Sequence, residues 1–343
     1  MNGLLKFITC GSVDDGKSTL IGRMLYDAKL IFADQKKALE LESKVGSREG
    51  KLDYSLLLDG LMAEREQGIT IDVAYRYFTT AHRSFIVADT PGHEEYTRNM
   101  AVGASFADLA VILVDATQGV LVQTRRHARI CALVGIRYFL FAVNKMDLAE
   151  YDQQYYKKIE KDIKKLAIDL QLDYVDVIPV SATEGDNVTK KSTHMLWYQK
   201  KTLLEYLETI DIDNRLEEQG FVMPVQRVCR PNAVFRGFQG QITSGTISVG
   251  DKITILPSGE KVSVQSILLT NQFVDSAKRG MPVTIQFDRE IDVSRGSVLK
   301  KDADLKVSSM FTASLLWMDD VELVQGRNFL IKIGTKMLPA TVM

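Results

Sequence analysis

The chain has 343 residues, and at roughly 150 residues per domain this length predicts two or three domains. Its 43 Lys and Arg against 44 Asp and Glu leave a net charge of −1, which does not indicate nucleic acid or an anionic membrane as a partner. The widely spaced Cys10, Cys131 and Cys229 are typical of buried thiols in a reducing cytoplasm rather than a disulfide framework. No apolar run approaches the ~20 residues that span a bilayer, and the first residues lack a signal-peptide pattern, so we expect a cytoplasmic protein.

Up to about residue 210, short apolar runs alternate with longer segments of helical spacing. This alternation is typical of parallel strands joined by crossover helices and predicts an α/β domain over residues 1–210. The second and third runs, 71–78 and 84–88, are separated by only five residues, which is too few for a crossover helix. These two strands are therefore expected to be antiparallel neighbours at one edge of a mixed, mostly parallel sheet. The expected strands are 6–10, 71–78, 84–88, 109–114, 138–143 and 175–180.

From residue 221 the pattern changes to short β-rich runs separated by Gly and Pro, such as 251–256 and 261–264. These two runs predict a hairpin within an all-β barrel over residues 221–306. The polar stretch 211–220 is the expected linker between the two domains. Residues 307–343 are too few for an independent core, so we expect a short, partial third domain that belongs to a second barrel or packs on the first.

The strongest motif follows the first predicted strand, where residues 11–18 match G-x-x-x-x-G-K-[ST] and a helical segment comes next. Glycines let the backbone curl so that successive N–H groups point at one anion, and the helix N-terminus adds partial positive charge. Lys17 is expected to neutralise the β- and γ-phosphates, and Ser18 to offer its hydroxyl to Mg²⁺. The nucleotide-binding residues expected here are Gly11, Ser12, Val13, Asp14, Asp15, Gly16, Lys17, Ser18 and Thr19.

A second motif, residues 144–147, follows the predicted strand 138–143 and indicates which nucleotide binds. The Asp147 carboxylate can accept from both N1–H and the 2-amino group of guanine, whereas adenine has no N1 proton. Ser181 and Ala182 follow the last predicted strand and fit a loop whose backbone N–H approaches guanine O6. GTP is therefore the expected nucleotide, and this part of its site is Asn144, Lys145, Met146, Asp147, Ser181 and Ala182.

A third motif ends the predicted strand 84–88 and is expected to respond to the γ-phosphate. Asp89 is placed to hold a water ligand of Mg²⁺, and the Gly92 N–H would lose its acceptor when that phosphate leaves. His93 is expected to orient the attacking water, with a helix-capping or partner-facing role as the alternative. The nucleotide-binding residues expected in this motif are Asp89, Thr90, Pro91, Gly92 and His93.

Thr70 precedes the strand 71–78 and is expected to give its hydroxyl to Mg²⁺ when the γ-phosphate is present. The predicted metal residues are thus Ser18, Thr70 and, through water, Asp89. The predicted catalytic residues are Lys17, Thr70 and His93. The charged region 34–66 before Thr70 is expected to be mostly helical and mobile.

The other histidines, His82, His127 and His194, lack the spacing of a metal site and are interpreted as surface residues. The lysine-rich segment 157–165 is interpreted as a solvated helix face rather than a nucleic-acid site.

Together and in order, these motifs resemble those of the translation-factor class of GTPases, in which a GTP domain precedes β-barrels. The resemblance to one branch, the GTPase subunits of sulfate adenylyltransferases, is closer and runs from about residue 4 to the end of the chain. That family normally has a full second barrel, of which this chain carries only a piece. The closer resemblance is carried by residues 11–19, 71–78, 89–100, 185–188, 197–198, 230–232 and 235–238.

The resemblance implies a GTP-hydrolysing subunit that drives a separate catalytic ATP sulfurylase subunit in sulfate assimilation. That partner would join ATP and sulfate into adenosine 5′-phosphosulfate and pyrophosphate. GTP and Mg²⁺ are the implied cofactors, and neither nucleic acid nor a membrane is an implied partner. The resemblance also implies that Lys17, Ser18 and Thr70 contact phosphate and Mg²⁺, and that His93 contacts the attacking water.

The main alternative is a translation elongation factor that binds aminoacyl-tRNA with the same GTP site and barrel plan. This alternative is disfavoured by Asp14 and Asp15, because bacterial elongation factors that carry aminoacyl-tRNA usually have Asp-His at these two positions. A P-loop kinase that uses ATP is disfavoured by residues 144–147, because Asp147 selects guanine.

Overall fold

The computed structural model describes residues 3–28, 52–57, 70, 72–212, 220–232 and 235–343. The chain forms two compact units, Met1–Ile212 and Asp213–Met343, and each is described by itself. The region 34–66, expected to be helical, lies outside the described residues except for residues 52–57, which include a short 3₁₀ turn, η1 (Tyr54–Leu57). Most of the expected linker 211–220 lies outside them as well.

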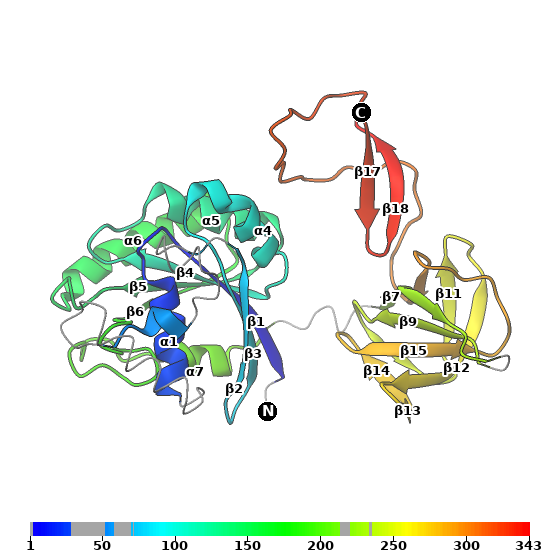
Figure 1. The fold of residues 1–343 in the computed structure, drawn as a ribbon, viewed down its shortest axis with the longest axis horizontal. Helices are drawn as coiled ribbons and strands as arrows, with labels where there is room; N and C mark the ends of the chain where they lie inside the picture. Colours follow the sequence, from blue (N-terminus) through cyan, green and yellow to red (C-terminus); the bar gives the residue numbers. More distant parts are fainter. Residues whose placement is uncertain (1–2, 29–51, 58–69, 71, 213–219, 233–234) are drawn as a thin grey trace. The chain divides into compact units, whose positions relative to one another are not determined.

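The first unit is built on a six-stranded sheet (Figure 1). Its strands are β1 (Leu4–Cys10), β2 (Ala74–Thr79), β3 (Ser84–Asp89), β4 (Leu109–Asp115), β5 (Tyr138–Asn144) and β6 (Tyr174–Pro179). In the order β2-β3-β1-β4-β5-β6, all neighbours are parallel except β2 and β3, which are antiparallel at the sheet edge. The predicted mixed, mostly parallel sheet and its antiparallel edge pair are therefore confirmed.

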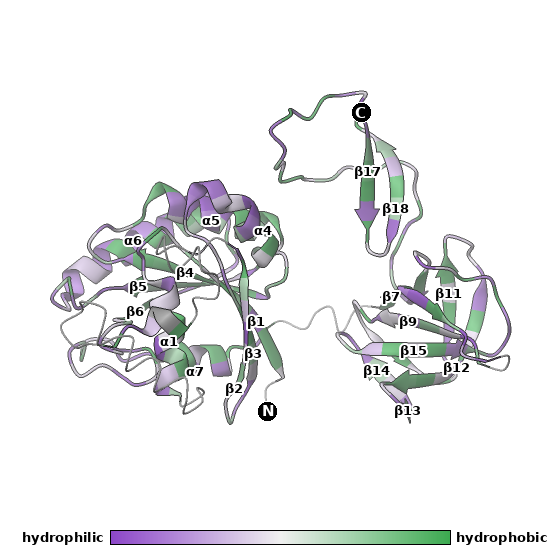
Figure 2. Cartoon of the chain, in the orientation of Figure 1, coloured by the Kyte–Doolittle hydropathy of each residue, from purple (hydrophilic) through white to green (hydrophobic). Residues whose placement is uncertain are grey.

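Helices cover both faces of this sheet. They are α1 (Lys17–Asp27), α4 (Thr97–Ala104), α5 (Val122–Leu133), α6 (Gln153–Asp169) and α7 (Leu203–Thr209). Figure 1 shows α4, α5 and α6 along one face and α1 and α7 along the other. Because both faces are covered, β4 and β5 are buried along their whole length. Figure 2 shows that the helices mix hydrophilic and hydrophobic residues. None of the helices in the described part of the chain is long and apolar enough to cross a bilayer.

The second unit is built on an antiparallel barrel. Its strands are β7 (Phe221–Pro224), β8 (Arg227–Cys229), β9 (Gly237–Gln241), β11 (Lys252–Leu256), β12 (Lys261–Leu269), β13 (Gln272–Val274), β15 (Pro282–Phe287) and β16 (Val298–Lys301), with a separate pair, β10 (Thr246–Ser248) and β14 (Ser276–Lys278). The strands follow the path β7-β16-β11-β12-β15-β9-β8. The first strand of the path, β7, also contacts β9 near its other end, so the sheet curls into a barrel. The antiparallel pairing of β11 with β12 confirms the predicted hairpin.

A two-stranded hairpin follows the barrel. Its strands, β17 (Asn328–Ile333) and β18 (Lys336–Thr341), pair only with each other among the described strands. The Thr335 hydroxyl in its turn donates to the Val225 carbonyl of the barrel at 2.8 Å. Leu330, Ile333 and Met337 are exposed on it, as expected of a short β piece without a core of its own.

Candidate functional site

Four predicted segments lie at one edge of the first sheet. The parallel strands β1, β3 and β5 each end directly before or within one of them, and β6 ends two residues before the fourth. The carboxyl ends of parallel strands lie along a common edge, where ligands of open α/β sheets bind. Residues 11–19 and 89–93 are named here the phosphate half, and residues 144–147 with 181–182 the base half.

The phosphate half begins with the tight loop between β1 and α1. Gly16 adopts a left-handed φ of 85°, and a Cβ there would lie 2.6 Å from Asn144 Nδ2, so the position requires glycine. The buried Lys17 ammonium turns back to donate to the carbonyls of Gly11, at 3.2 Å, and Ser12, at 2.7 Å. The Ser12 hydroxyl is buried without a hydrogen-bond partner. An ammonium and an unsatisfied hydroxyl in one loop are donors that an incoming anion would satisfy.

The remaining residues of this loop take varied environments. Asp14 is exposed with a left-handed φ of 65°. The Asp15 carboxylate is buried and accepts from the Ser12 backbone N–H at 2.5 Å. Val13 and Thr19 are half-buried, Thr19 within α1.

Burial shifts the pKa of three charged groups in the phosphate half. It lowers the pKa of the Lys17 ammonium, against the attraction of Asp89. It raises the pKa of Asp89, against Lys17 and the hydroxyls of Ser18 and Thr9. It also raises the pKa of Asp15 to about 6, although Lys17 favours the charged form. Clustered pKa shifts caused by burial and specific charge partners are typical of functional sites.

Two of the residues expected at Mg²⁺ are in contact. Ser18 Oγ donates to Asp89 Oδ2 at 2.9 Å, and Thr9 Oγ1 donates to the other oxygen, Oδ1, at 3.0 Å. Hydroxyl and carboxylate oxygens are ligands that Mg²⁺ prefers. No group of three or more His, Cys, Asp or Glu side chains suited to a metal occurs in the described part of the chain. The donor set thus fits an ion that takes its other ligands from phosphate and water.

The loop after β3 packs directly on the Lys17 loop. Thr90 Oγ1 donates to the Thr9 carbonyl at 2.7 Å, and Pro91 is buried beside it. A Cβ at Gly92 would lie only 2.5 Å from Lys17 Nζ, so this close approach requires glycine. The Gln123 side chain of α5 donates to the Gly92 carbonyl at 3.3 Å. Gly92 therefore contacts the ammonium that is expected to bind phosphate.

His93 and Thr70 make no hydrogen bond to Lys17, Ser18 or Asp89 among the bonds of the described residues. His93 Nδ1 accepts from the Glu95 backbone N–H at 3.4 Å at the start of η2 (Glu94–Tyr96), which is the helix-capping role named as its alternative. Its side chain is 43% exposed and so is open to solvent water. Thr70 is half-buried, and no hydrogen bond between described residues joins it to Ser18 or Asp89. The expected role of Thr70 at Mg²⁺ therefore stays a prediction.

Asn144 connects the two halves of the site. Its side-chain Nδ2 donates to the Asp15 carbonyl at 2.8 Å, and its Oδ1 accepts from the Ala182 backbone N–H at 2.9 Å. Because Asn144 is 1% exposed, both bonds are shielded from water and hold the loops firmly. One amide thus fixes the phosphate loop against the loop that contains Ala182.

The rest of the base half is also hydrogen-bonded. Ser181 Oγ donates to Asp147 Oδ1 at 2.6 Å, so the structure brings these two residues together. Met146 is buried, and its N–H donates to the Val180 carbonyl at 3.2 Å. Lys145 has a left-handed φ of 62°.

Two residues of the site, Asp115 and Arg23, were missed by the sequence analysis. Asp115 ends β4 and accepts from Lys145 Nζ at 2.7 Å. Burial favours its neutral form, but the bonds from Lys145 and Thr117 hold its pKa below the ordinary value. Asp115 lies at the end of a predicted strand, as Asp89 does, and this position is the sequence pattern that could have identified it. Arg23 of α1 donates to the Thr183 carbonyl at 2.6 Å, a contact with no sequence pattern.

The interpretation of His127 as a surface residue is wrong. Its side chain is fully buried in α5, and neither ring nitrogen has a hydrogen-bond partner. Burial lowers the pKa of His127 to about 3, with a further contribution from the Lys17 charge. The physical reason is helical spacing, because His127 falls on the buried face of α5 with Thr124 and Cys131.

The other surface interpretations agree with the structure. His82 and His194 are exposed, and so are the lysines of segment 157–165 on α6.

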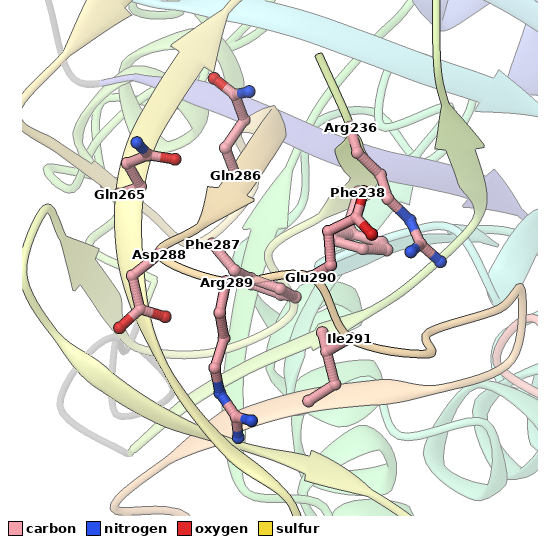
Figure 3. A pocket seen from close by; sticks show the side chains of 9 residues that line it. All are labelled: Arg236, Phe238, Gln265, Gln286, Phe287, Asp288, Arg289, Glu290 and Ile291. Atoms are coloured by element: carbon pink, nitrogen blue, oxygen red, sulfur yellow. The ribbon is translucent and has the colours of Figure 1, made fainter. Parts of the chain in front are cut away.

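A shallow pocket of about 200 Å³ lies in the barrel unit. Figure 3 shows its lining residues: Arg236, Phe238, Gln265, Gln286, Phe287, Asp288, Arg289, Glu290 and Ile291. Phe238 and Phe287 stack with ring centroids 4.6 Å apart. Arg289 and Glu290 are already paired, with Glu260 at 3.9 Å and Arg230 at 3.6 Å. Its two arginines are balanced by two acids, so we assign it no part in nucleotide binding.

The fold and the two-part site define a P-loop GTPase of the translation-factor class. The family model of the elongation factor Tu GTP binding domain matches residues 2–213. The crystal structure of a bacterial selenocysteine-specific elongation factor shares the fold, with a TM-score of 0.50 and 21% identity. That alignment covers 98% of this chain and 51% of the other.

Two curated relatives are similar over nearly the whole chain. Sulfate adenylyltransferase subunit 1 of Francisella tularensis subsp. novicida is 53% identical over 99% of this chain and 72% of the relative. The bifunctional enzyme NodQ of Rhizobium meliloti is 51% identical over 99% of this chain and 53% of its own length. The chain belongs to the sulfate adenylyltransferase subunit 1 family of elongation factor Tu-type GTPases.

Proposed function

We propose that this chain binds GTP with Mg²⁺ across the phosphate and base halves and hydrolyses its γ-phosphate bond. The observation that carries this proposal is the Asn144 bridge, which holds the Asp15 carbonyl and the Ala182 N–H at 2.8 and 2.9 Å. A nucleotide that contacts both halves would meet two loops that are already fixed relative to each other. Such preorganisation reduces the entropy that binding must overcome.

In this proposal the phosphate half neutralises the triphosphate. Lys17 exchanges its two carbonyl partners for β- and γ-phosphate oxygens. These oxygens are stronger acceptors, because they are anionic and the ammonium is positively charged. The N-terminus of α1 and the Ser12 hydroxyl add donors. Ser18 and, through water, Asp89 hold Mg²⁺, with Thr70 as a further ligand. When bound, Mg²⁺ supplies charge neutralisation on the phosphate oxygens.

The base half selects guanine. The Asp147 oxygens accept from N1–H and the 2-amino group. The Ala182 N–H, which donates to Asn144 Oδ1 at 2.9 Å, shares this bond with O6 of the base, as a three-centre hydrogen bond can. Ser181, which donates to Asp147 at 2.6 Å, holds the carboxylate in place. Adenine would leave this acceptor unpaired, and that mismatch is the source of the selectivity.

His93 orients the attacking water in this proposal, and the Gly92 contact with Lys17 reports the γ-phosphate. Loss of that phosphate removes the group on which both Lys17 and the Gly92 N–H converge, so the 89–93 loop is released. The helix-capping bond of His93 sets the position of its ring. The proposal requires the ring to lie beside the γ-phosphate when GTP is bound.

We further infer that GTP hydrolysis is coupled to a separate catalytic subunit that makes adenosine 5′-phosphosulfate and pyrophosphate from ATP and sulfate. The relatives at 51 to 53% identity support this inference, because the first is named as one subunit of a sulfate adenylyltransferase. The sulfate–phosphate anhydride is costly to form, and a switch whose two states bind a partner differently can transmit free energy to that step. The free thiols support a cytoplasmic location.

The decisive experiment measures pyrophosphate release from ATP and sulfate by the matching catalytic subunit. It compares reactions with and without this chain, and GTP with a non-hydrolysable analogue. We expect synthesis to rise only with this chain and hydrolysable GTP. GTP hydrolysis without any effect on synthesis would contradict the coupling, and GTP-dependent capture of aminoacyl-tRNA would revive the elongation-factor alternative.

A further inference from the structure

Between β6 and α7 runs a segment without regular helix or strand, and its middle part, residues 185–198, is named here the bracing segment. Its inner side chains are packed as in a core: Asn187, Val188 and Met195 are at most 1% exposed. The mechanism proposed above gives these residues no role. Such burial in an irregular segment indicates a fixed shape rather than a loose connection.

One end of the bracing segment holds the Ser181–Ala182 loop. The Asp186 carbonyl accepts from the Ser181 backbone N–H at 3.1 Å. Asn187, with a left-handed φ of 55°, donates from Nδ2 to the Pro179 carbonyl at 3.0 Å and accepts from the Ser192 N–H at 2.9 Å. Ser181 and Pro179, two residues before it, are therefore tied to this segment.

Asp186 also fixes the middle of the segment. Its Oδ1 accepts from Ser192 Oγ at 2.6 Å and lies 3.2 Å from His194 Nδ1. The Asp186 side chain is 8% exposed and Ser192 is buried, so the Ser192 bond is a shielded bond to a carboxylate and is stronger than a bond between neutral groups.

The other end of the segment holds the turn that contains Asp147. Trp197 Nε1 donates to the Tyr151 carbonyl at 3.0 Å, and the Tyr151 ring stacks on His194 with centroids 4.6 Å apart. The Tyr151 N–H in turn donates to the Met146 carbonyl at 2.8 Å. The position of Tyr151 thus determines how the turn closes around Asp147.

We propose that the bracing segment is a specificity determinant that touches no part of the nucleotide. It sets the spacing between Asp147 and the Ser181–Ala182 loop by holding one through Trp197 and the other through Asp186. Trp197 and Asp186 are positioning residues, and the ligand class that they discriminate is purine nucleotides differing at the 2-position. This inference rests on the proposed binding of GTP and adds the reason why its guanine contacts are selective.

Trp197→Phe tests the proposal, because phenylalanine keeps an aromatic ring but has no N–H for the Tyr151 carbonyl. The measurement is the ratio of dissociation constants for ITP and GTP, since ITP lacks only the 2-amino group. We expect this ratio to fall about fivefold, the size of one lost neutral hydrogen bond. A merely structural role would weaken both nucleotides equally and leave the ratio unchanged.

Tyr198→Phe is the matched control. It removes the neighbouring hydroxyl, which donates to the Lys201 carbonyl at 3.2 Å and to neither base loop. We expect it to keep the wild-type ratio. An unchanged ratio in Trp197→Phe, or an equal fall in both variants, would overturn the proposal.

Two further readouts keep the test decisive. If Trp197→Phe does not fold, Ser192→Ala removes a bond to Asp186 with a smaller change in volume and carries the same expectation. Failure of the wild-type chain to bind GTP would contradict the proposed function. A wild-type chain that prefers GTP to ITP, with variants that keep the preference, would contradict only the bracing role.

Discussion

The phosphate half and the base half of the site are stabilised in different ways. In the phosphate half, burial lowers the pKa of Lys17 and raises the pKa values of Asp15 and Asp89, which favours the neutral form of each group. The Ser12 hydroxyl there has no hydrogen-bond partner. In the base half, Asn144 and Asp147 are hydrogen-bonded to neighbouring loops. The site therefore holds poorly solvated charges on one side and satisfied hydrogen bonds on the other.

This difference indicates that the two halves contribute different things to binding. Buried charges lower stability, but they bind a ligand of complementary charge tightly. A prearranged hydrogen-bond network discriminates instead, because a wrong ligand leaves one of its members unpaired. We therefore expect the phosphate half to set the affinity for any nucleoside triphosphate and the base half to set the choice among them.

Asp147→Asn should have the largest effect. An amide at this position would present a donor to N1–H and the 2-amino group of guanine, whereas xanthine carries an oxygen in place of that amino group. We expect the ratio of XTP to GTP affinities to rise by about 10⁴-fold, as for other sites that lose a buried hydrogen-bond match. Competition binding of the two nucleotides measures the ratio.

Asp152→Asn is the control for that substitution, because Asp152 caps α6 only five residues further along and an amide oxygen retains the cap. It should keep the wild-type preference for GTP. If Asp147→Asn also kept it, the base half as defined here would not be the base site.

Lys17→Met should have the next largest effect, and of a different kind. Methionine keeps the length of the buried side chain but removes the charge-assisted hydrogen bonds to phosphate. We expect GTP and ITP to bind about 10²-fold more weakly, as two such bonds would predict. The ratio between the two nucleotides should not change. Isothermal titration measures both constants, and a changed ratio would show that the halves do not act separately.

The fold was largely predictable from the sequence because its signals are strong and local. The apolar runs that become β4 and β5 are buried on both sides, so they carry no competing pattern. The five residues between the second and third runs sufficed to make β2 antiparallel to β3. The barrel hairpin likewise followed from Gly and Pro placement.

The site was predictable only where a motif fixes the backbone. Lys17, Asp89 and Asn144 follow strand ends that the apolar pattern locates. Arg23 was missed because its contact with the Thr183 carbonyl joins residues 160 positions apart. His127 was misplaced because its polarity was weighed above its position on the buried face of α5.

His127→Leu should change how stability depends on pH. Burial lowers the pKa of His127 from 6.5 to about 3, so below pH 6.5 the unfolded chain binds a proton that the folded chain does not. Folding therefore loses stability as pH falls, by about 2 kcal/mol at pH 5. Leucine removes that loss. Urea unfolding at pH 7 and pH 5 tests this, and an equal loss in wild type and variant would contradict it.

The smallest effect, a change in the free energy of unfolding, should come from replacing one serine by alanine in each half, as two separate variants. Ser181→Ala removes the 2.6 Å bond to Asp147 and the acceptor for the Glu184 N–H, so it should lower the free energy of unfolding by about 1 kcal/mol. Ser12→Ala removes a buried hydroxyl that has no partner, so stability without nucleotide should be unchanged or slightly higher. Urea unfolding of both variants decides the matter. Equal destabilisation would mean that the Ser12 hydroxyl is satisfied in solution and that the two halves are alike.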